Sequence, residues 1–118
     1  MPLHTAQDPS QIQSFSDVGE QFLVFYSSRD DAGRMWCPDC RDVEDLVERT
    51  FASADGPSAL IIYVGQRNEW RETPSNTFRG EPWNVQSIPT IIRVTDSQED
   101  SRLVENEIPE KLASFVQK

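Results

Sequence analysis

Two short apolar runs, separated by one amphipathic segment, constrain the fold of this chain more than any other feature. Residues 21–26 (QFLVFY) and 59–64 (ALIIYV) are continuous apolar and aromatic stretches that are too short for buried helices. They are typical of strands that are covered on both faces. Between them, residues 43–51 carry apolar side chains at helical spacing, with charged residues on the other faces. The order strand, helix, strand predicts a right-handed crossover between parallel strands.

The second half of the chain predicts further elements around this unit. Residues 87–95 (SIPTIIRVT) predict a strand, residues 96–101 a polar turn, and residues 102–106 a short strand that completes an antiparallel hairpin. Residues 108–118 predict a final helix, and apolar residues spaced by three predict a short helix over residues 10–18. The result is an α/β fold around a central sheet.

The segment between residues 65 and 84 is rich in Gly, Pro and Asn and can hold at most short helical turns. Trp70, Phe78 and Trp83 stand alone within it. Isolated large aromatics in an irregular segment more often anchor it to a core than bind a cofactor. We therefore expect these three residues in the core.

The chain of 118 residues has a formal net charge of -9, and its apolar residues are spread along its whole length. These features predict one domain, residues 1–118, with one core. The first residues lack the basic and apolar regions of a secretory signal, and no apolar run approaches the roughly 18 residues of a membrane-spanning helix. We therefore expect a soluble, cytoplasmic protein. Its negative charge makes nucleic acid and anionic membranes unlikely partners.

Both cysteines of the chain, Cys37 and Cys40, lie in the segment MWCPDC, directly before the predicted helix. Because cytoplasmic thiols are kept reduced, such a pair is more often redox-active or metal-binding than a structural disulfide. A structural zinc site needs four ligands, whereas the chain offers two cysteines and the distant His4, which is expected at the surface. A redox-active dithiol is thus favoured over a zinc site and over a structural pair, which would close no long loop.

The position of the pair at a helix start assigns a different role to each cysteine. The free backbone N–H groups of a helix N-terminus stabilise a thiolate, which is the form that attacks disulfides. Cys37 is therefore predicted to be the nucleophile. Cys40 lies on the same face one turn deeper, within disulfide reach, and is predicted to be the resolving thiol.

The residues around the pair carry a more specific resemblance. With Trp36 before the cysteines and Ile88-Pro89-Thr90 before the predicted strand, the sequence resembles the thioredoxin fold, in which a WCxxC turn faces a cis-proline loop. The segments WCPDC, SSRDDAGRM (residues 27–35), YVGQRNEWRETPSNTFR (residues 63–79) and IPT are more narrowly similar to the thioredoxin domain-containing protein 17 family, also called the 14 kDa thioredoxin-related protein.

The resemblance implies a thioredoxin fold, with a central mixed β-sheet flanked by helices on both faces. It also implies a cytosolic disulfide reductase that acts on small, cystine-like disulfides and on selected protein disulfides. Thioredoxin reductase would recharge the dithiol with electrons from NADPH, and no bound cofactor or metal is expected. The Ile88–Pro89 bond would be cis. The expected substrate-binding residues are Trp36, Pro38, Ile88, Pro89 and Thr90.

Two local features modify this expectation. The buried aspartate that thioredoxins keep in the strand before the active site is replaced here by Phe25 or Tyr26. Asp39 is then a candidate for proton transfer or for tuning the reactivity of the thiols, although the helix dipole alone would favour a carboxylate there. Residues 27–35 form a longer link than in ordinary thioredoxins and are expected to exclude large partners from the dithiol.

Two other classes of function fit parts of the same pattern. One is a redox-inert binding module of thioredoxin fold, in which the groove beside Pro89 holds an extended peptide. The other is a thiol peroxidase, which also places a reactive cysteine at a helix start but normally separates its two thiols by more than one turn. Turnover of disulfides compared with turnover of peroxide separates the three classes.

Overall fold

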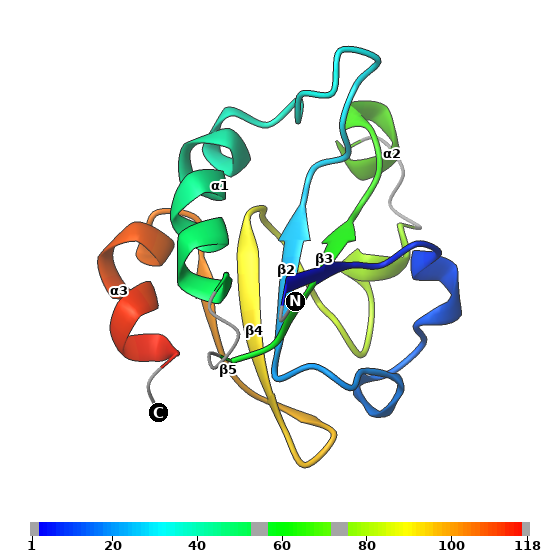
Figure 1. Cartoon of the computed structure of the whole chain (residues 1–118). Coiled ribbons are helices and arrows are strands. Elements are labelled where there is room, and N and C mark those ends of the chain that lie inside the picture. Colours follow the sequence, from blue (N-terminus) through cyan, green and yellow to red (C-terminus); the bar gives the residue numbers. More distant parts are fainter. Residues whose placement is uncertain (1–2, 53–56, 72–75, 117–118) are drawn as a thin grey trace.

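The computed structural model describes residues 3–52, 57–71 and 76–116, and its centre is a five-stranded mixed sheet (Figure 1). The strand order is β1-β3-β2-β4-β5. The first three strands run parallel to one another, while β4 is antiparallel to β2 and to β5. The bounds are β1 Leu3–Thr5, β2 Phe22–Tyr26, β3 Ala59–Tyr63, β4 Thr90–Thr95 and β5 Gln98–Val104. The predicted mixed sheet and the parallel pairing across the crossover are confirmed.

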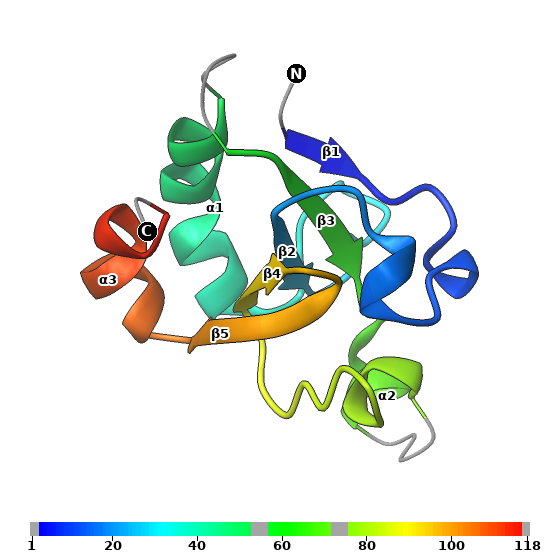
Figure 2. The same cartoon turned by 90° about the horizontal axis from the view of Figure 1, so that it is seen from below.

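Helices α1 (Pro38–Phe51) and α3 (Glu107–Phe115) pack together on one face of this sheet, and α2 (Arg67–Arg71) lies on the other side (Figure 2). Helix α1 buries the apolar stripe that its sequence predicts, with Val43, Val47 and Phe51 all inside. The Phe22 ring of β2 lies 5.5 Å from Phe51 and 5.6 Å from Phe115, measured between ring centroids. These contacts join both helices to the central strand.

An aromatic cluster covers the opposite face of β2. Trp83 is fully buried, and its ring centroid lies 4.8 Å from that of Phe15, 6.1 Å from that of Phe25 and 6.1 Å from that of Phe78. Trp70 is buried as well, so the three expected core anchors are confirmed. Because successive side chains of a strand point to opposite faces, Phe22 and Phe25 serve the two halves of the core.

The N-terminal segment differs from its prediction. Instead of one helix over residues 10–18, the chain forms two short 3₁₀ helices, Pro9–Gln11 and Phe15–Asp17. The Asp17 carboxylate accepts hydrogen bonds from the backbone N–H groups of Gln13 and Ser14, at 2.9 and 3.2 Å. Such side-chain acceptors compete with helical backbone bonds and favour tight turns. Strand β1 was not predicted at all.

The hairpin after β4 is tighter than predicted. Strand β4 begins at Thr90 and β5 begins at Gln98, so only Asp96 and Ser97 remain between the strands. Both have positive φ, 54° and 63°, the conformation of a two-residue turn whose twist matches that of the strands. The predicted turn over residues 96–101 was therefore too long.

No helix within the described ranges is long and apolar enough to cross a membrane.

Candidate active site

The two cysteines lie at the start of α1 and differ in depth. Cys37 is the N-cap of the helix and Pro38 is its first residue, a position where the missing proline N–H costs no hydrogen bond. Cys37 is 7% exposed, whereas Cys40 is 0% exposed. Neither forms a disulfide, so the structure represents the dithiol form. Cys37 is thus the outer thiol and Cys40 the inner one, and their roles as nucleophile and resolving thiol stay predictions.

Ser27, the first residue after β2, connects the end of that strand to both cysteines. Its hydroxyl accepts a hydrogen bond from the Cys37 backbone N–H at 3.2 Å, and its own N–H donates to the Cys40 sulfur at 3.4 Å. Ser27 is completely buried. The helix start is thus held in register with the sheet. Nothing in the sequence marks this serine, because a small polar residue after an apolar run is common.

The loop before β4 faces the outer thiol. The Cys37 sulfur lies 3.8 Å from the Ile88 carbonyl oxygen, and the Ile88–Pro89 peptide bond is cis. The Pro89 carbonyl accepts a hydrogen bond from the Glu105 N–H at 2.8 Å, and the Thr90 hydroxyl donates to the Ser87 carbonyl at 2.6 Å. These bonds fix the loop at the start of β4, opposite Cys37.

A pocket of about 230 Å³ opens beside the outer thiol. It is lined by Trp36, Cys37, Asp39, Trp70, Arg71, Arg79, Gln86, Ser87, Ile88 and Glu105. Four of the predicted site residues are therefore brought together, namely Trp36, Cys37, Asp39 and Ile88. Pro38 is exposed and Pro89 and Thr90 are buried, and none of these three lines the pocket.

The pocket also contains charged residues that the sequence did not single out. Arg71, Arg79 and Glu105 come from α2, from the 3₁₀ helix Thr77–Arg79 and from the connection between β5 and α3. They are 34, 42 and 68 positions beyond Cys37 in the chain. No local pattern links such distant residues, so only the fold could reveal them.

Trp36 forms one wall of the site and is itself held from two sides. Its indole N–H donates to the Gly65 carbonyl at 2.9 Å, and the side chain is half-buried. The guanidinium carbons of Arg67 and Arg71 lie 5.4 and 5.7 Å from the ring centroid. Both distances fall within the range of cation–π contacts. The expected place of Trp36 beside the nucleophile agrees with this geometry.

The long segment 27–35 is fastened to α1 and to the end of β3. Arg29 forms an ion pair with Glu44 of α1 and donates to the Tyr63 hydroxyl at 3.1 Å. Its carbonyl accepts a hydrogen bond from the Gln66 side chain at 2.8 Å. Residues 30–34 are exposed, and none of residues 28–35 lines the pocket beside Cys37. The expected steric filter by this segment stays a prediction.

Of Phe25 and Tyr26, the two residues expected in place of the thioredoxin aspartate, Tyr26 lies on the side of the dithiol. Phe25 packs on the opposite face, against Phe78 and Trp83, whereas the Tyr26 hydroxyl interacts electrostatically with Cys40. Burial, the charge of Cys40 and that of Glu44 raise the pKa of Tyr26 far above its ordinary value. The hydroxyl has no hydrogen-bond partner within the described part of the chain. Tyr26 therefore cannot serve as a proton acceptor near neutral pH.

Burial also raises the pKa of the Cys40 thiol, and the charge of Cys37 acts in the same direction. The N–H of Ser27 opposes this effect but does not outweigh it. Cys40 is consequently protonated at neutral pH until a proton acceptor reaches it.

The carboxylate of Asp39 is exposed, and no hydrogen bond joins it to either sulfur in the described structure. The described residues also contain no group of three or more His, Cys, Asp or Glu arranged for a metal ion.

The buried thiol of Cys40 and the buried phenol of Tyr26 predict that the reduced protein loses stability in alkaline solution. Ordinary pKa values are 9.0 for the thiol and 10.0 for the phenol, and folding raises both. The unfolded chain therefore releases their protons first, and the free energy of unfolding should fall above about pH 9, by up to about 1.4 kcal/mol per pH unit for each group. Urea unfolding at a series of pH values measures this slope.

The matched control is Tyr26→Phe. It removes one titrating group together with a hydroxyl that lacks a partner, so it should leave stability near neutral pH unchanged or higher and should make the alkaline loss smaller. Equal slopes for the two proteins would contradict the assignment to Tyr26.

Comparisons with known proteins agree with this geometry. Residues 6–116 match the family described as thioredoxin domain-containing protein 17-like, thioredoxin domain. The chain is 32% identical over 87 residues to thioredoxin domain-containing protein 17 of Homo sapiens, covering 73% of this chain and 67% of that protein. It is 31% identical over 94 residues to the thioredoxin-like protein Clot of Oryza sativa subsp. japonica, covering 74% and 67%.

Solved structures show the same fold at lower identity. Trxlp from Edwardsiella tarda superposes with a TM-score of 0.60 at 18% identity, covering 97% of both chains. The poplar thioredoxin h PtTrxh4 superposes with a TM-score of 0.58 at 16% identity, covering 100% of this chain and 99% of that one. The sheet and the helices thus form a thioredoxin fold. The chain belongs to the thioredoxin domain-containing protein 17-like family of thioredoxin-type oxidoreductases.

Proposed function

We propose that this protein is a dithiol–disulfide reductase that acts on small disulfides and on selected protein disulfides. The observation that carries the proposal is the unequal placement of the two thiols. Cys37 caps α1 and opens into a pocket, while Cys40 is fully buried one turn deeper and is tied to the same serine. This arrangement suits an outer thiol that attacks a substrate and an inner thiol that releases it.

The reaction balances as two successive exchanges. The Cys37 thiolate attacks one sulfur of the substrate disulfide RSSR, which forms a Cys37–S–S–R bond and expels RS⁻. The expelled thiolate takes the proton of the Cys40 thiol and leaves as RSH. The Cys40 thiolate then attacks the Cys37 sulfur, which forms the Cys37–Cys40 disulfide and expels a second thiolate that is protonated by solvent. The protein loses two electrons, and the substrate gains them.

The site has no ordinary buried base among the described residues that could take the proton of Cys40. Tyr26 lies on the side of Cys40 and its pKa is raised, so it cannot accept the proton. The leaving thiolate is a suitable acceptor because it is generated in the pocket. Asp39 lines the same pocket and is the protein carboxylate that we propose to pass the proton from Cys40 to this thiolate. Trp36 and Ile88 would shape the substrate-binding wall beside it.

Membership of the family supports the proposed partners. Thioredoxin reductase would return the Cys37–Cys40 disulfide to the dithiol with electrons from NADPH, in the cytoplasm, without a cofactor bound to this chain. A coupled assay of NADPH oxidation with cystine, oxidised glutathione and a protein disulfide tests the proposal directly. Disulfide turnover is the expected result. A protein that turned over none of these, or that turned over peroxide instead, would be a binding module or a peroxidase.

The same assay tests selectivity. We expect the second-order rate constant for cystine to exceed that for insulin by at least about tenfold, a difference that corresponds to about 1.4 kcal/mol. The pocket has a volume of about 230 Å³ and Cys37 is 7% exposed, so a disulfide within a folded protein cannot easily reach the sulfur. The net charge of -9 also opposes acidic partners.

A variant with residues 30–34 shortened separates two causes of this selectivity. If the segment acts as a filter, the variant should reduce insulin faster while its rate with cystine stays unchanged. If the pocket alone sets the ratio, neither rate should change. Equal rates for cystine and insulin in the intact protein would contradict the expected selectivity altogether.

A further inference from the structure

The pocket beside Cys37 has charges of opposite sign on two walls. Arg71 and Arg79 line it from the side of α2. Asp39 and Glu105 line it from the side of α1 and α3, and Figure 2 places α2 and α3 on opposite sides of the sheet. The nucleophilic sulfur therefore opens between a cationic wall and an anionic wall.

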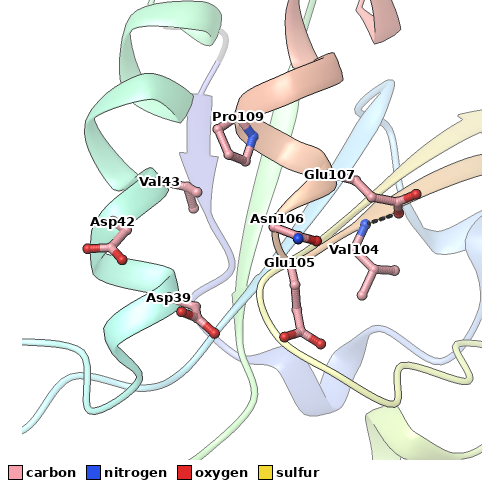
Figure 3. A pocket seen from close by; sticks show the side chains of 8 residues that line it. All are labelled: Asp39, Asp42, Val43, Val104, Glu105, Asn106, Glu107 and Pro109. Atoms are coloured by element: carbon pink, nitrogen blue, oxygen red, sulfur yellow. Dashed lines mark hydrogen bonds between the residues drawn. The ribbon is translucent and has the colours of Figure 1, made fainter.

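The anionic wall continues into a larger neighbouring cavity. This cavity has a volume of about 680 Å³ and lies between α1 and the start of α3. Asp39 and Glu105 line both spaces, and Asp42 and Glu107 line the larger one (Figure 3). The Glu107 carboxylate accepts a hydrogen bond from the Val104 N–H at 2.9 Å. The side chains of Asp39 and Glu105 are thus the acidic groups that border the space next to Cys37.

The cationic wall is not neutralised within the described part of the chain. The ion pairs found there involve Arg29, Arg49, Arg93, Arg102 and Lys111, and none involves Arg67, Arg71 or Arg79. Arg79 donates to the Trp70 carbonyl at 2.8 Å and stacks on the Trp70 ring at 4.1 Å. Arg71 is exposed and shares the Trp36 ring with Arg67. Two guanidinium groups on one ring repel each other, and a bound anion would relieve that repulsion.

We propose that Arg71, supported by Arg79, binds a carboxylate of the disulfide substrate while Cys37 attacks its sulfur. The guanidinium group presents a planar pair of N–H donors that matches a carboxylate, and it stays charged throughout. Glu105 receives a substrate ammonium group on the opposite wall. The proposal rests on the function proposed above. It assigns to Arg71 and Glu105 the recognition of the two charged groups that cystine-like disulfides carry within a few bonds of the sulfur.

Four small disulfides test this charge recognition. Cystine carries both charges, 3,3′-dithiodipropionate only carboxylates, cystamine only ammonium groups, and 2-hydroxyethyl disulfide neither. The pre-reduced protein is mixed with each of them, and the rate constant for oxidation of its dithiol is followed by tryptophan fluorescence. This single-turnover format needs no recycling enzyme, so it does not depend on thioredoxin reductase.

Arg71→Gln is expected to slow the reactions with cystine and dithiodipropionate by about tenfold or more, because a charged hydrogen-bonded contact is lost. The rates with cystamine and hydroxyethyl disulfide should stay within about twofold. Arg71→Lys keeps the charge without the planar pair of donors, so its rate constants with cystine and dithiodipropionate should lie between those of the wild type and of Arg71→Gln. Glu105→Gln should show the mirror pattern, slowing cystine and cystamine while sparing dithiodipropionate.

Arg67→Gln is the matched control. Arg67 lies on the same helix and on the same Trp36 ring but does not line the pocket, so any effect of its loss should be equal for the four substrates. If Arg71→Gln slows all four alike, or if Arg67→Gln reproduces its selectivity, carboxylate binding by Arg71 is refuted. If Glu105→Gln leaves the rates with cystine and cystamine unchanged, ammonium binding by Glu105 is refuted. A wild-type protein that reduces none of the four contradicts the proposed function itself.

Discussion

Replacing Cys37 with serine is expected to reduce disulfide turnover to the background of uncatalysed exchange. Cys37 is the thiol that opens into the pocket, with its sulfur 3.8 Å from the Ile88 carbonyl oxygen. A serine hydroxyl is hardly ionised near neutral pH and does not form an exchangeable bond with a disulfide sulfur. The coupled assay and the single-turnover assay should both report the loss. Residual turnover within about tenfold of wild type would show that another group attacks the substrate.

Replacing Cys40 with serine should give the complementary result. Cys37 can still attack once, but no inner thiol remains to release it, so a mixed disulfide between Cys37 and half of the substrate should accumulate. Mass spectrometry after reaction with cystine measures this adduct. Ser27→Ala is a useful companion, since it keeps both thiols but removes the hydroxyl that accepts from the Cys37 N–H. It should form no lasting adduct.

Alkylation of the reduced wild type checks the assignment independently. Cys40 is completely buried and its pKa is raised, so iodoacetamide near neutral pH should label Cys37 first. Labelling of Cys40 should increase with pH as its thiolate forms. Preferential labelling of Cys40 near neutral pH would reverse the roles of the two cysteines.

Replacing Trp83 with alanine should cost about 3 to 5 kcal/mol of unfolding free energy. Trp83 is fully buried and contacts Phe15, Phe25 and Phe78, so its removal would leave a cavity against β2. Arg102 of β5 donates to the Trp83 carbonyl at 2.8 Å, which holds the backbone around that cavity and limits its collapse. Urea unfolding followed by circular dichroism measures the change.

Trp36→Ala is the matched control for this variant. Trp36 is only half-buried at the margin of the core, and exposed arginines lie against its ring, so its loss should cost less than half as much stability. It should act on disulfide reduction instead, because Trp36 lines the pocket beside Cys37. If the two variants lost the same stability, the aromatic cluster around Trp83 would not be the anchor of that face.

The elements that could be predicted are those whose own residues determine their environment. Strands β2 and β3 are continuous apolar runs, and α1 carries its buried residues at helical spacing, so burial alone selects their conformation. The cysteines follow from the same logic, because two residues between them at a helix start place both on one face. Strand β1 is different. It has three residues, two of them exposed, and it exists because its backbone pairs with the edge of β3.

The chemistry of the site depends on contacts that span long distances in the chain. The spacing of the cysteines predicts which thiol is outer and which is inner, but the protonation of Cys40 follows from its burial and from the Ser27 N–H, which are properties of the packed state. Arg71 and Glu105 both line the pocket beside Cys37 only because β3 and β5 run in the same direction and finish at the same end of the sheet. Local sequence therefore determined the strands, the helix and the reactive pair, since short-range periodicity and burial select them. The tertiary structure decided the charges around the pair, because electrostatic interactions depend on distance in space and not on separation along the chain.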